Sequence, residues 1–431
     1  MTDVSPRPRH NLSMPALGAL LVLGVASGVP FDLAGATLQS WITDAAPGLK
    51  TSDIGAFSLV ALPYSLKPLW SPLLDRFTPP LVGRFGRRRG WIILAQLACA
   101  AAIACLALVD PQHSPVTIAI LALALSFFSA TQDIVVDAWR SDVLPPQSRA
   151  LGAAAASWGY RMGILLAGYL APVLATGVGL GWSTAYLCMA LIMATGPIAM
   201  LITPREPDDI MPPRTLREAV VLPFANLWTR PGLSRRTLVL FLVLVLTYKL
   251  GDAFGSSLLT TFLQRGLGFS PDEGAAYRKW IGIAGLFVGM LAGGFIMIRV
   301  RVGTALLIFG VMQAVTNLTF VGLADTHRDF TYLAVALAAE NIATGLGSVA
   351  FVAFLTSLCD RRFSATQYAL LASLASLGRV VVGPIAGPTA EALDWAGYYW
   401  VSVAAALPGL VLVVIALPRL RELDQPATDD A

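Results

Sequence analysis

Twelve runs of about 20 mostly apolar residues recur along this chain, and they constrain its fold more than any other feature. A helix of about 20 residues crosses the hydrocarbon core of a bilayer. Only 13% of the residues are charged, against about 25% in soluble domains. We therefore expect an all-α integral membrane protein whose twelve transmembrane helices form two six-helix halves. The expected spans are residues 14–38, 53–73, 91–109, 116–138, 150–174, 183–203, 237–262, 276–298, 303–323, 331–356, 367–389 and 398–418.

The segments between these runs differ in basic charge, and this difference predicts the orientation. If the N-terminus is cytoplasmic, 21 Lys and Arg residues fall in cytoplasmic segments and five in the opposite segments. The five are Lys50, Arg265, Arg278, Lys279 and Arg328. Because positive charge is retained on the cytoplasmic side, we expect both termini in the cytoplasm. Because the basic residues lie in particular loops, the net charge of +4 reflects membrane topology and does not indicate nucleic-acid binding.

The two halves of the chain repeat a short pattern. Arg149–Arg161 and Gln367–Arg379 align without gaps at a shift of 218 residues, and the same shift places Asp142 on Asp360. Parallel repeats of six helices are a known transporter plan, with the substrate bound near the midplane between them. The expected organisation is a first half at 1–203, a cytoplasmic linker at 204–236, a second half at 237–418 and a cytoplasmic tail at 419–431.

The linker contains one segment with a helical pattern. Arg214–Trp228 is weakly amphipathic and is broken by Pro223, which predicts an interfacial helix. An unstructured linker is the alternative.

Glycines recur four residues apart within four of the expected spans. This spacing puts them on one helix face, where they let two membrane helices approach closely. The stripes are Gly24 and Gly28; Gly159 and Gly163; Gly285, Gly289 and Gly293; and Gly383 and Gly387.

Nine ionisable residues fall inside the expected spans. Each costs about 2.5–3.5 kcal/mol or more when it faces lipid at mid-depth, so nine together would exceed a net stability of about 5–15 kcal/mol. Most of them must therefore face a cavity or one another, and static interhelical ion pairs are the structural alternative to a function. The nine are Asp32, Lys67, Asp133, Asp137, Arg161, Lys249, Asp252, Glu340 and Arg379.

These charges favour a carrier of anions that is coupled to protons. Basic groups in a cavity attract an anionic substrate, and carboxylates beside them take up or release a proton as desolvation and nearby cations compete. We expect Asp133, Asp137, Asp252 and Glu340 to take part in proton coupling. Arg161, Lys249 and Arg379 are the basic residues expected to bind such a substrate.

Other chemistries lack their sequence signals. The chain has no Walker A motif for ATP, no cysteine or histidine spacing typical of a metal site and no nucleophile–base set of an enzyme. We expect no cofactor beyond the proton gradient. We expect a monomer in the lipid bilayer, with protons and a small anion as its partners.

The stretch from Asp75-Arg76 to Gly86–Gly90 resembles the D-R-x-G-R-R loop of the major facilitator superfamily, between spans two and three. It departs from that pattern by an insertion of nine residues, Phe77–Phe85. Charged residues at these helix ends predict a gate that locks two helices in one state. The expected gating residues are Lys67, Asp75, Arg76 and Arg87.

Longer stretches resemble one branch of that superfamily, the AmpG-type anhydromuropeptide permeases. They are Gly24–Pro30 with Thr37–Gln39, Lys67–Arg76, Arg87–Trp91, Ser129–Leu144, Gly159–Gly163, Tyr248–Phe254 and Glu340–Cys359. The resemblance implies proton-driven import of N-acetylglucosaminyl-1,6-anhydro-N-acetylmuramyl species, with or without the stem peptide, for peptidoglycan recycling. It also implies a bacterial inner-membrane location and motif positions near the pathway at Gln132, Asp133, Lys249, Asp252, Glu340 and Asn341. For such a substrate, Gln132 and Asn341 are expected to offer hydrogen bonds, and Tyr64, Trp70 and Trp139 are expected to stack on its sugar rings.

The same superfamily holds carriers of other cargo, which stay open as alternatives. An acyl-CoA-like anion would suit the basic groups equally well. A pigment-associated, non-transporting assembly factor with the same fold is a second alternative, although three basic groups in a cavity are costly beside an apolar pigment. A membrane enzyme is disfavoured, because the residues of a catalytic set are missing.

Overall fold

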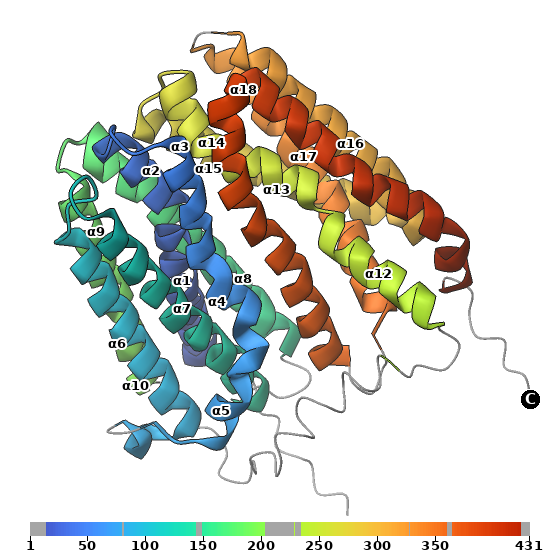
Figure 1. Ribbon diagram of the computed structural model, residues 1–431. Helices are drawn as coiled ribbons and strands as arrows, with labels where there is room; N and C mark the ends of the chain where they lie inside the picture. Colours follow the sequence, from blue (N-terminus) through green and yellow to red (C-terminus); the bar gives the residue numbers. More distant parts are fainter. Residues whose placement is uncertain are drawn as a thin grey trace, which may run out of the picture.

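The computed structural model describes residues 14–79, 82–143, 149–202, 228, 234–326, 328–359 and 364–423 (Figure 1). These residues form helices and turns, and the described part of the chain contains no strand. Figure 1 shows two helical bundles side by side, one from the blue-to-green part of the chain and one from the yellow-to-red part. The all-helical fold class is therefore confirmed.

In the first half, the second span is interrupted at its prolines. Pro63, Pro68 and Pro72 divide the second span into short α and 3₁₀ segments, because proline lacks the backbone N–H that continues a helix.

The elements of the first half are α1 (Met14–Ala34), α2 (Ala36–Ala45), α3 (Thr51–Ala56), η1 (Phe57–Ala61), α4 (Leu62–Leu66), η2 (Lys67–Leu69), α5 (Ser71–Arg76), η3 (Gly83–Phe85), α6 (Arg87–Ala107), α7 (Pro115–Val143), α8 (Arg149–Leu165), the π-helical turns η5 (Leu166–Leu170) and η6 (Val173–Gly177), α9 (Trp182–Met193) and α10 (Thr195–Ile202).

In the second half, Asp394 separates the last two spans. Its backbone has φ 57° and ψ −175°, which breaks the helix between them. The elements are α12 (Arg235–Thr247), α13 (Leu250–Ser257), α14 (Leu259–Thr261), the π-helical turn η8 (Phe262–Gly266), α15 (Pro271–Met297), α16 (Val302–Ala324), α17 (Phe330–Ser357) and α18 (Ser364–Leu423).

Nine stretches of the described chain are helical, long and apolar enough to cross a membrane. One of them, residues 367–420, contains the two spans that Asp394 separates. The second and fifth expected spans correspond to the broken helices of residues 51–76 and to α8 with its two π-helical turns. The twelve expected spans therefore all have helical counterparts. The linker helix expected at 214–228 lies outside the described residues, apart from Trp228.

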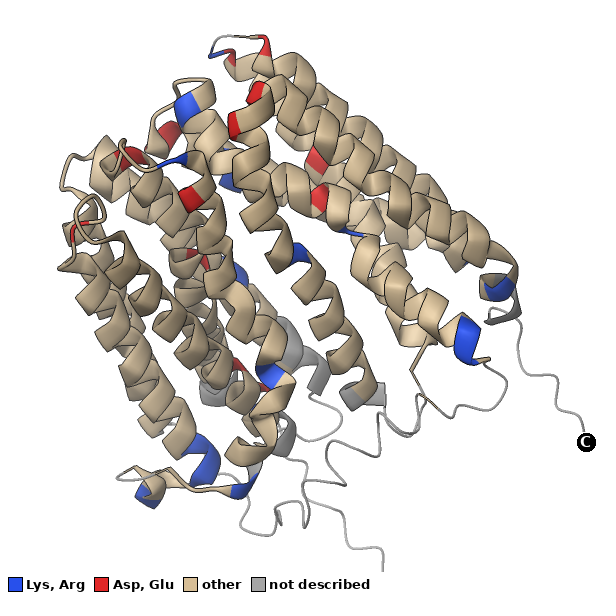
Figure 2. Cartoon of the chain, viewed as in Figure 1, with Lys and Arg blue, Asp and Glu red and all other residues tan. Residues whose placement is uncertain are grey.

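The bundle has two chemically different ends (Figure 2). We call the end that carries Arg87–Arg89 and Arg301 the basic end. We call the opposite end, which carries Asp110, Asp329 and Glu391, the acidic end. The two halves meet at the acidic end and diverge towards the basic end (Figure 1).

The contacts between the halves follow the sequence repeat. Gln39 donates to the carbonyl of Ser257 at 2.8 Å, and the hydroxyl groups of Thr43 and Thr261 lie 3.2 Å apart. Both hydrogen bonds join residues separated by 218 positions, which is the shift that relates the repeated segments. Equivalent residues therefore meet at the boundary between the halves, as they do on a pseudo-twofold axis.

The glycine stripes lie where helices come closest. A Cβ atom on Gly24 would collide with the backbone of Ala156, and one on Gly159 would collide with the backbone of Leu21, so α1 and α8 touch through their backbones. Gly289 on α15 packs in the same way against Ile342 of α17. These three stripes bring helices together within one half, whereas Gly383 and Gly387 meet residues 51–58 of the other half. The close helix approach that the glycine spacing predicts is present at each of these contacts.

Candidate functional site

A cavity of about 320 Å³ lies between the two halves. The first half contributes Phe31, Gln39 and Tyr64 to its lining, and the second half contributes Arg278 and Arg379. Pockets for small molecules typically have about 300–1,000 Å³ and a few well-placed polar groups. The cavity therefore has the size and position of a substrate site in a two-half carrier.

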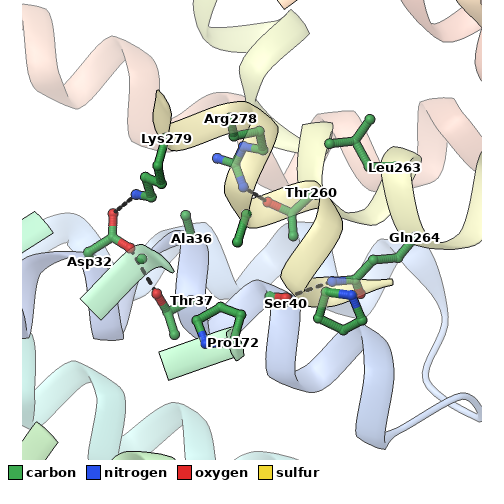
Figure 3. A pocket seen from close by; sticks show the side chains of 14 residues that line it. Asp32, Ala36, Thr37, Ser40, Pro172, Thr260, Leu263, Gln264, Arg278 and Lys279 are labelled. Atoms are coloured by element: carbon green, nitrogen blue, oxygen red, sulfur yellow. Dashed lines mark hydrogen bonds and ion pairs between the residues drawn. The ribbon is translucent and has the colours of Figure 1, made fainter. Parts of the chain in front are cut away.

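Beside this cavity the two halves meet in a seam, whose side chains are shown in Figure 3. Lys279 Nζ lies 2.6 Å from Asp32 Oδ1, and Thr37 donates to the other oxygen of Asp32 at 2.8 Å. Nearby, Gln264 donates to Ser40 across the seam at 2.6 Å. Both members of the Asp32–Lys279 pair are buried, so each charge compensates the other where water cannot.

Arg278 and Lys279 lie within α15, inside the expected span 276–298, although the charge count assigned them to the segments opposite the cytoplasm. Ser270 and Glu273 form a capping box that begins α15 at Pro271, which places Lys279 about 12 Å further along the helix at 1.5 Å per residue. Lys279 then reaches Asp32, and Arg278 donates to Thr260. The signal was present in the sequence, because Ser-Pro-x-Glu is a typical helix start.

In the first half, two predicted carboxylates are held in ion pairs. Lys67 Nζ lies 2.6 Å from Asp133 Oδ2, and Arg140 lies 3.0 Å from Asp137. Both carboxylates also line a second cavity of about 370 Å³, together with Arg161. The structure thus joins a predicted gating residue, Lys67, to a predicted coupling residue, Asp133, through an ion pair.

The other residues predicted in the first half differ in their surroundings. Gln132 is buried and donates to Ser27 at 3.0 Å. Trp70 donates to Thr131 and lines an apolar groove beside Phe127. Trp139 is only 1% exposed, in a cluster of aliphatic side chains. Tyr64 therefore lines the cavity between the halves, whereas Trp70 lines a different groove and Trp139 is buried in this conformation.

In the second half, Lys249 Nζ lies 3.7 Å from Asp252 Oδ2. Asn341 donates to Glu340 at 2.6 Å. Thr344 lies between the two carboxyl groups, with its hydroxyl 2.8 Å from Asp252 and 3.3 Å from Glu340. Four predicted residues from two helices, α13 with its N-cap and α17, are thus brought together around a threonine that sequence reasoning did not single out.

The predicted gating residues lie towards the basic end. Lys67 is the one with a described ion pair, to Asp133. Arg76 is exposed and lies over the ring of Phe77 at 5.7 Å, and Arg87 begins α6. The side chain of Asp75 lies outside the described residues.

Arg89, which the sequence assigned only to a basic loop, is buried and ties two helices together. It donates to the backbone carbonyls of Met200 and Leu201 at 2.7 Å and 3.1 Å. These carbonyls belong to the last turn of α10, where no intrahelical donor is available. Arg89 therefore caps α10 and fixes its end against α6.

Sequence comparison gives two kinds of relatives. A family model described as acetyl-coenzyme A transporter 1 matches residues 17–172. The anhydromuropeptide permease of Escherichia coli K12 is 45% identical over 406 residues, which cover 94% of this chain and 80% of that protein. A Rickettsia felis protein described as transporter AmpG 4 is 32% identical and covers 92% of this chain and 95% of its own length.

Solved structures share the arrangement of helices at much lower identity. The nucleoside transporter NupG superposes with a TM-score of 0.72 at 13% identity, covering 95% of this chain and 100% of NupG. A POT family transporter in complex with a thioalcohol-conjugated peptide has a TM-score of 0.73 at 12% identity, covering 95% of this chain and 96% of that one. At this identity the likeness shows the fold alone, that of major facilitator transporters.

Proposed function

The chain belongs to the family of anhydromuropeptide permeases, and we propose that it imports N-acetylglucosaminyl-1,6-anhydro-N-acetylmuramyl cell-wall fragments, with or without their stem peptide, for peptidoglycan recycling. One observation carries this proposal, the 45% identity to the Escherichia coli permease over 94% of the chain. The chain is a transporter and not an enzyme, and the proteins that it resembles are transporters too.

The chemistry of the cavity agrees with such a substrate. Phe31 and Tyr64 meet edge to face, with ring centroids 5.1 Å apart, and offer apolar surface to a sugar ring. Gln39, Ser256 and Ser257 offer polar groups to hydroxyl and amide groups. No aspartate or glutamate is among the residues that line this described cavity, which favours a negatively charged cargo.

An acyl-CoA-like anion is the second candidate, because the acetyl-coenzyme A transporter model matches residues 17–172. Phosphate groups would meet the same arginines as a carboxylate. A pigment is disfavoured by these charged groups, since an apolar molecule cannot compensate them.

Uptake by cells that lack their own permease decides between these cargoes. We expect cells that express this chain to accumulate radiolabelled anhydromuropeptide well above cells with an empty vector. Unlabelled anhydromuropeptide should compete, and acetyl-CoA should not. Failure to import the muropeptide, combined with uptake of the acyl-CoA, would assign the second cargo. Proteoliposomes that take up neither would favour a non-transporting assembly factor.

We further propose that Asp252 and Glu340 bind the coupled proton. Thr344 has one hydroxyl hydrogen, yet it lies within hydrogen-bonding distance of both carboxyl groups. Gln313 also donates to this hydroxyl, at 3.3 Å. When both carboxyl groups are ionised, the hydroxyl can donate to only one of them. A proton on either carboxyl group supplies the second hydrogen bond, so this cluster is suited to hold one proton.

Asp133 and Asp137 are proposed to act in gating and coupling through their ion pairs. Lys67 joins the second span to α7 through Asp133, and these helices must shift if the basic end closes. The proposed gate includes Asp75, Arg76 and Arg87 at that end. A single chain supplies both halves of the cavity, which supports a monomer as the working unit.

The charge difference between the two ends supports our proposal that the basic end faces the cytoplasm. Because Arg278 and Lys279 lie within α15, the basic residues counted on the acidic side are reduced to Lys50, Arg265 and Arg328. The difference in basic charge between the two sides is therefore larger than the sequence count gave. In this orientation the seam closes the periplasmic side, and import would proceed from that side to the cytoplasm.

A reporter fused after Ala431 tests this orientation. We expect green fluorescent protein to be fluorescent there and alkaline phosphatase to be inactive, because both termini are proposed to be cytoplasmic. Fusions after Asp110, at the acidic end, should show the reverse pattern. An active phosphatase after Ala431 would contradict the proposed topology.

A further inference from the structure

Three of the arginines that line the two cavities described above have no carboxylate within 4.0 Å in the part of the chain that the structure describes. They are Arg161, Arg278 and Arg379. The lysines at comparable depth differ, because Lys67, Lys249 and Lys279 each lie close to an aspartate. An unpaired cation inside a membrane protein is costly and faces a cavity or a ligand. The arginines, and not the lysines, are therefore available to an anion.

Two of these arginines line the same cavity. Arg278 comes from α15 and Arg379 from α18, and both line the cavity between the halves. Arg278 also reaches the seam, where it donates to Thr260 (Figure 3). Arg379 is exposed. This leaves guanidinium N–H groups for a bound molecule.

Arg161 has different surroundings. It lies over the ring of Phe287 at 4.6 Å, and its cavity also contains Asp133 and Asp137. Two carboxylates in that lining oppose the binding of a second negative charge. Lys249 is engaged with Asp252. Of the basic residues expected to bind substrate, Arg379 is therefore the one that lines the cavity between the halves without a carboxylate partner. Arg278 lines the same cavity, also without a carboxylate partner.

We propose that Arg278 and Arg379 form the carboxylate subsite of the carrier, with the sugar rings of the substrate against Phe31 and Tyr64. Guanidinium groups recognise carboxylates through paired N–H donors, and such charge-assisted hydrogen bonds are the stronger ones. The proposal rests on muropeptide import as the function. It names the lactyl carboxylate of the peptide-free disaccharide, or a stem-peptide carboxylate, as the group that is bound.

The test compares an acid with its neutral methylamide, which replaces the carboxylate charge and leaves the two sugars unchanged. The peptide-free anhydro-disaccharide carries a single lactyl carboxylate, and its methylamide is neutral. Competition against radiolabelled disaccharide in cells that lack their own permease gives the affinity for each form. We expect the wild type to prefer the acid. Arg278→Gln and Arg379→Gln should each weaken acid binding about 10-fold, the usual effect of losing one charge-assisted hydrogen bond, and should change amide binding little.

Two further variants control for charge and folding. Arg278→Lys keeps the charge and should retain most of the preference for the acid. Arg301→Gln makes the same substitution at an exposed position of the basic end, and it should leave both affinities unchanged. An acid-to-amide ratio that neither Gln variant changes would overturn the subsite. Equal loss of acid and amide binding in Arg379→Gln would do the same, because a structural role affects both forms.

The same experiment gives a different result if muropeptide import is not the function of this protein. If wild-type cells take up neither form of the disaccharide, muropeptide import is wrong. If the wild type takes up the acid but its preference persists in both Gln variants, import stands and the subsite is wrong. If acetyl-CoA competes more strongly than the acid in the wild type, the arginines bind phosphate groups of another cargo.

Discussion

Replacing Gly387 with leucine is expected to reduce transport between about 5-fold and 150-fold while the protein still folds in the membrane. Gly387 lies on α18 at the seam, facing α3 of the other half. A Cβ atom at this position would meet the backbone of Ser52 at 2.5 Å and the carbonyl oxygen of Thr51 at 2.7 Å. Backbone atoms cannot move aside cheaply, so the halves must separate to make room.

The size of the effect follows from the two-state cycle. A carrier alternates between opening at one end and at the other, by moving one half against the other. Overpacking costs about 1–3 kcal/mol, and the leucine imposes this cost only when the acidic end is closed. A bias of that size shifts the equilibrium by about 5–150-fold. The variant should therefore accumulate with its acidic end open.

Cysteine labelling measures this bias directly. Gln39 lies in the seam and donates to Ser257, so we place a single cysteine there after replacing the four native cysteines with alanine. An impermeant maleimide applied from the acidic-end side should label the cysteine at position 39 faster when Gly387→Leu is present than when Gly387 is retained. Unchanged labelling together with normal transport would show that this contact does not limit opening.

Two other glycines separate this effect from misfolding. No atom lies within 4 Å of a Cβ placed on Gly294, which is exposed on α15. Gly294→Leu should therefore transport normally. Gly289 lies on the same helix but packs against the backbone of Ile342 within one half. Gly289→Leu should lose folded protein rather than change which end is open.

The fold followed from the sequence because the lipid environment leaves few alternatives. Apolar runs of sufficient length must become helices, and the repeat at a shift of 218 indicated two related halves. The breaks were less predictable. Pro63, Pro68 and Pro72 fragment the second span, whereas Pro384 lies within the helical run of α18, and sequence alone did not distinguish these outcomes.

The site was harder to predict, because pairing between spans depends on tertiary contacts. Lys249 and Asp252 are three residues apart on one helical face, so their approach followed from local geometry. Asp32 and Lys279 are 247 residues apart in the chain, and no local pattern connects them. The glycine stripes were recognised, but only the structure distinguishes Gly159, which packs within one half, from Gly387, which packs between the halves.

The coupling cluster is where a single neutral substitution should have the largest effect on transport. Asp252 and Glu340 approach each other through Thr344, while Lys249 lies on the other side of Asp252. Asn and Gln keep the shape and polarity of these side chains but cannot release a proton. The cavity and the seam should survive such a change, since neither Asp252 nor Glu340 lines the described cavity between the halves.

Asp252→Asn and Glu340→Gln are therefore expected to abolish proton-driven accumulation of the substrate, while exchange of labelled for unlabelled substrate persists. One proton moving through about 100 mV supplies about 2.3 kcal/mol, which supports an accumulation of roughly 50-fold. Each variant should instead equilibrate to a ratio near one in vesicles with an imposed proton gradient. Asp325→Asn, an identical change at an exposed acidic-end position, should accumulate normally. Undiminished uphill uptake by both neutral variants would reject this cluster as the proton site, because each variant lacks one of the two carboxyl groups that are proposed to share the proton through Thr344.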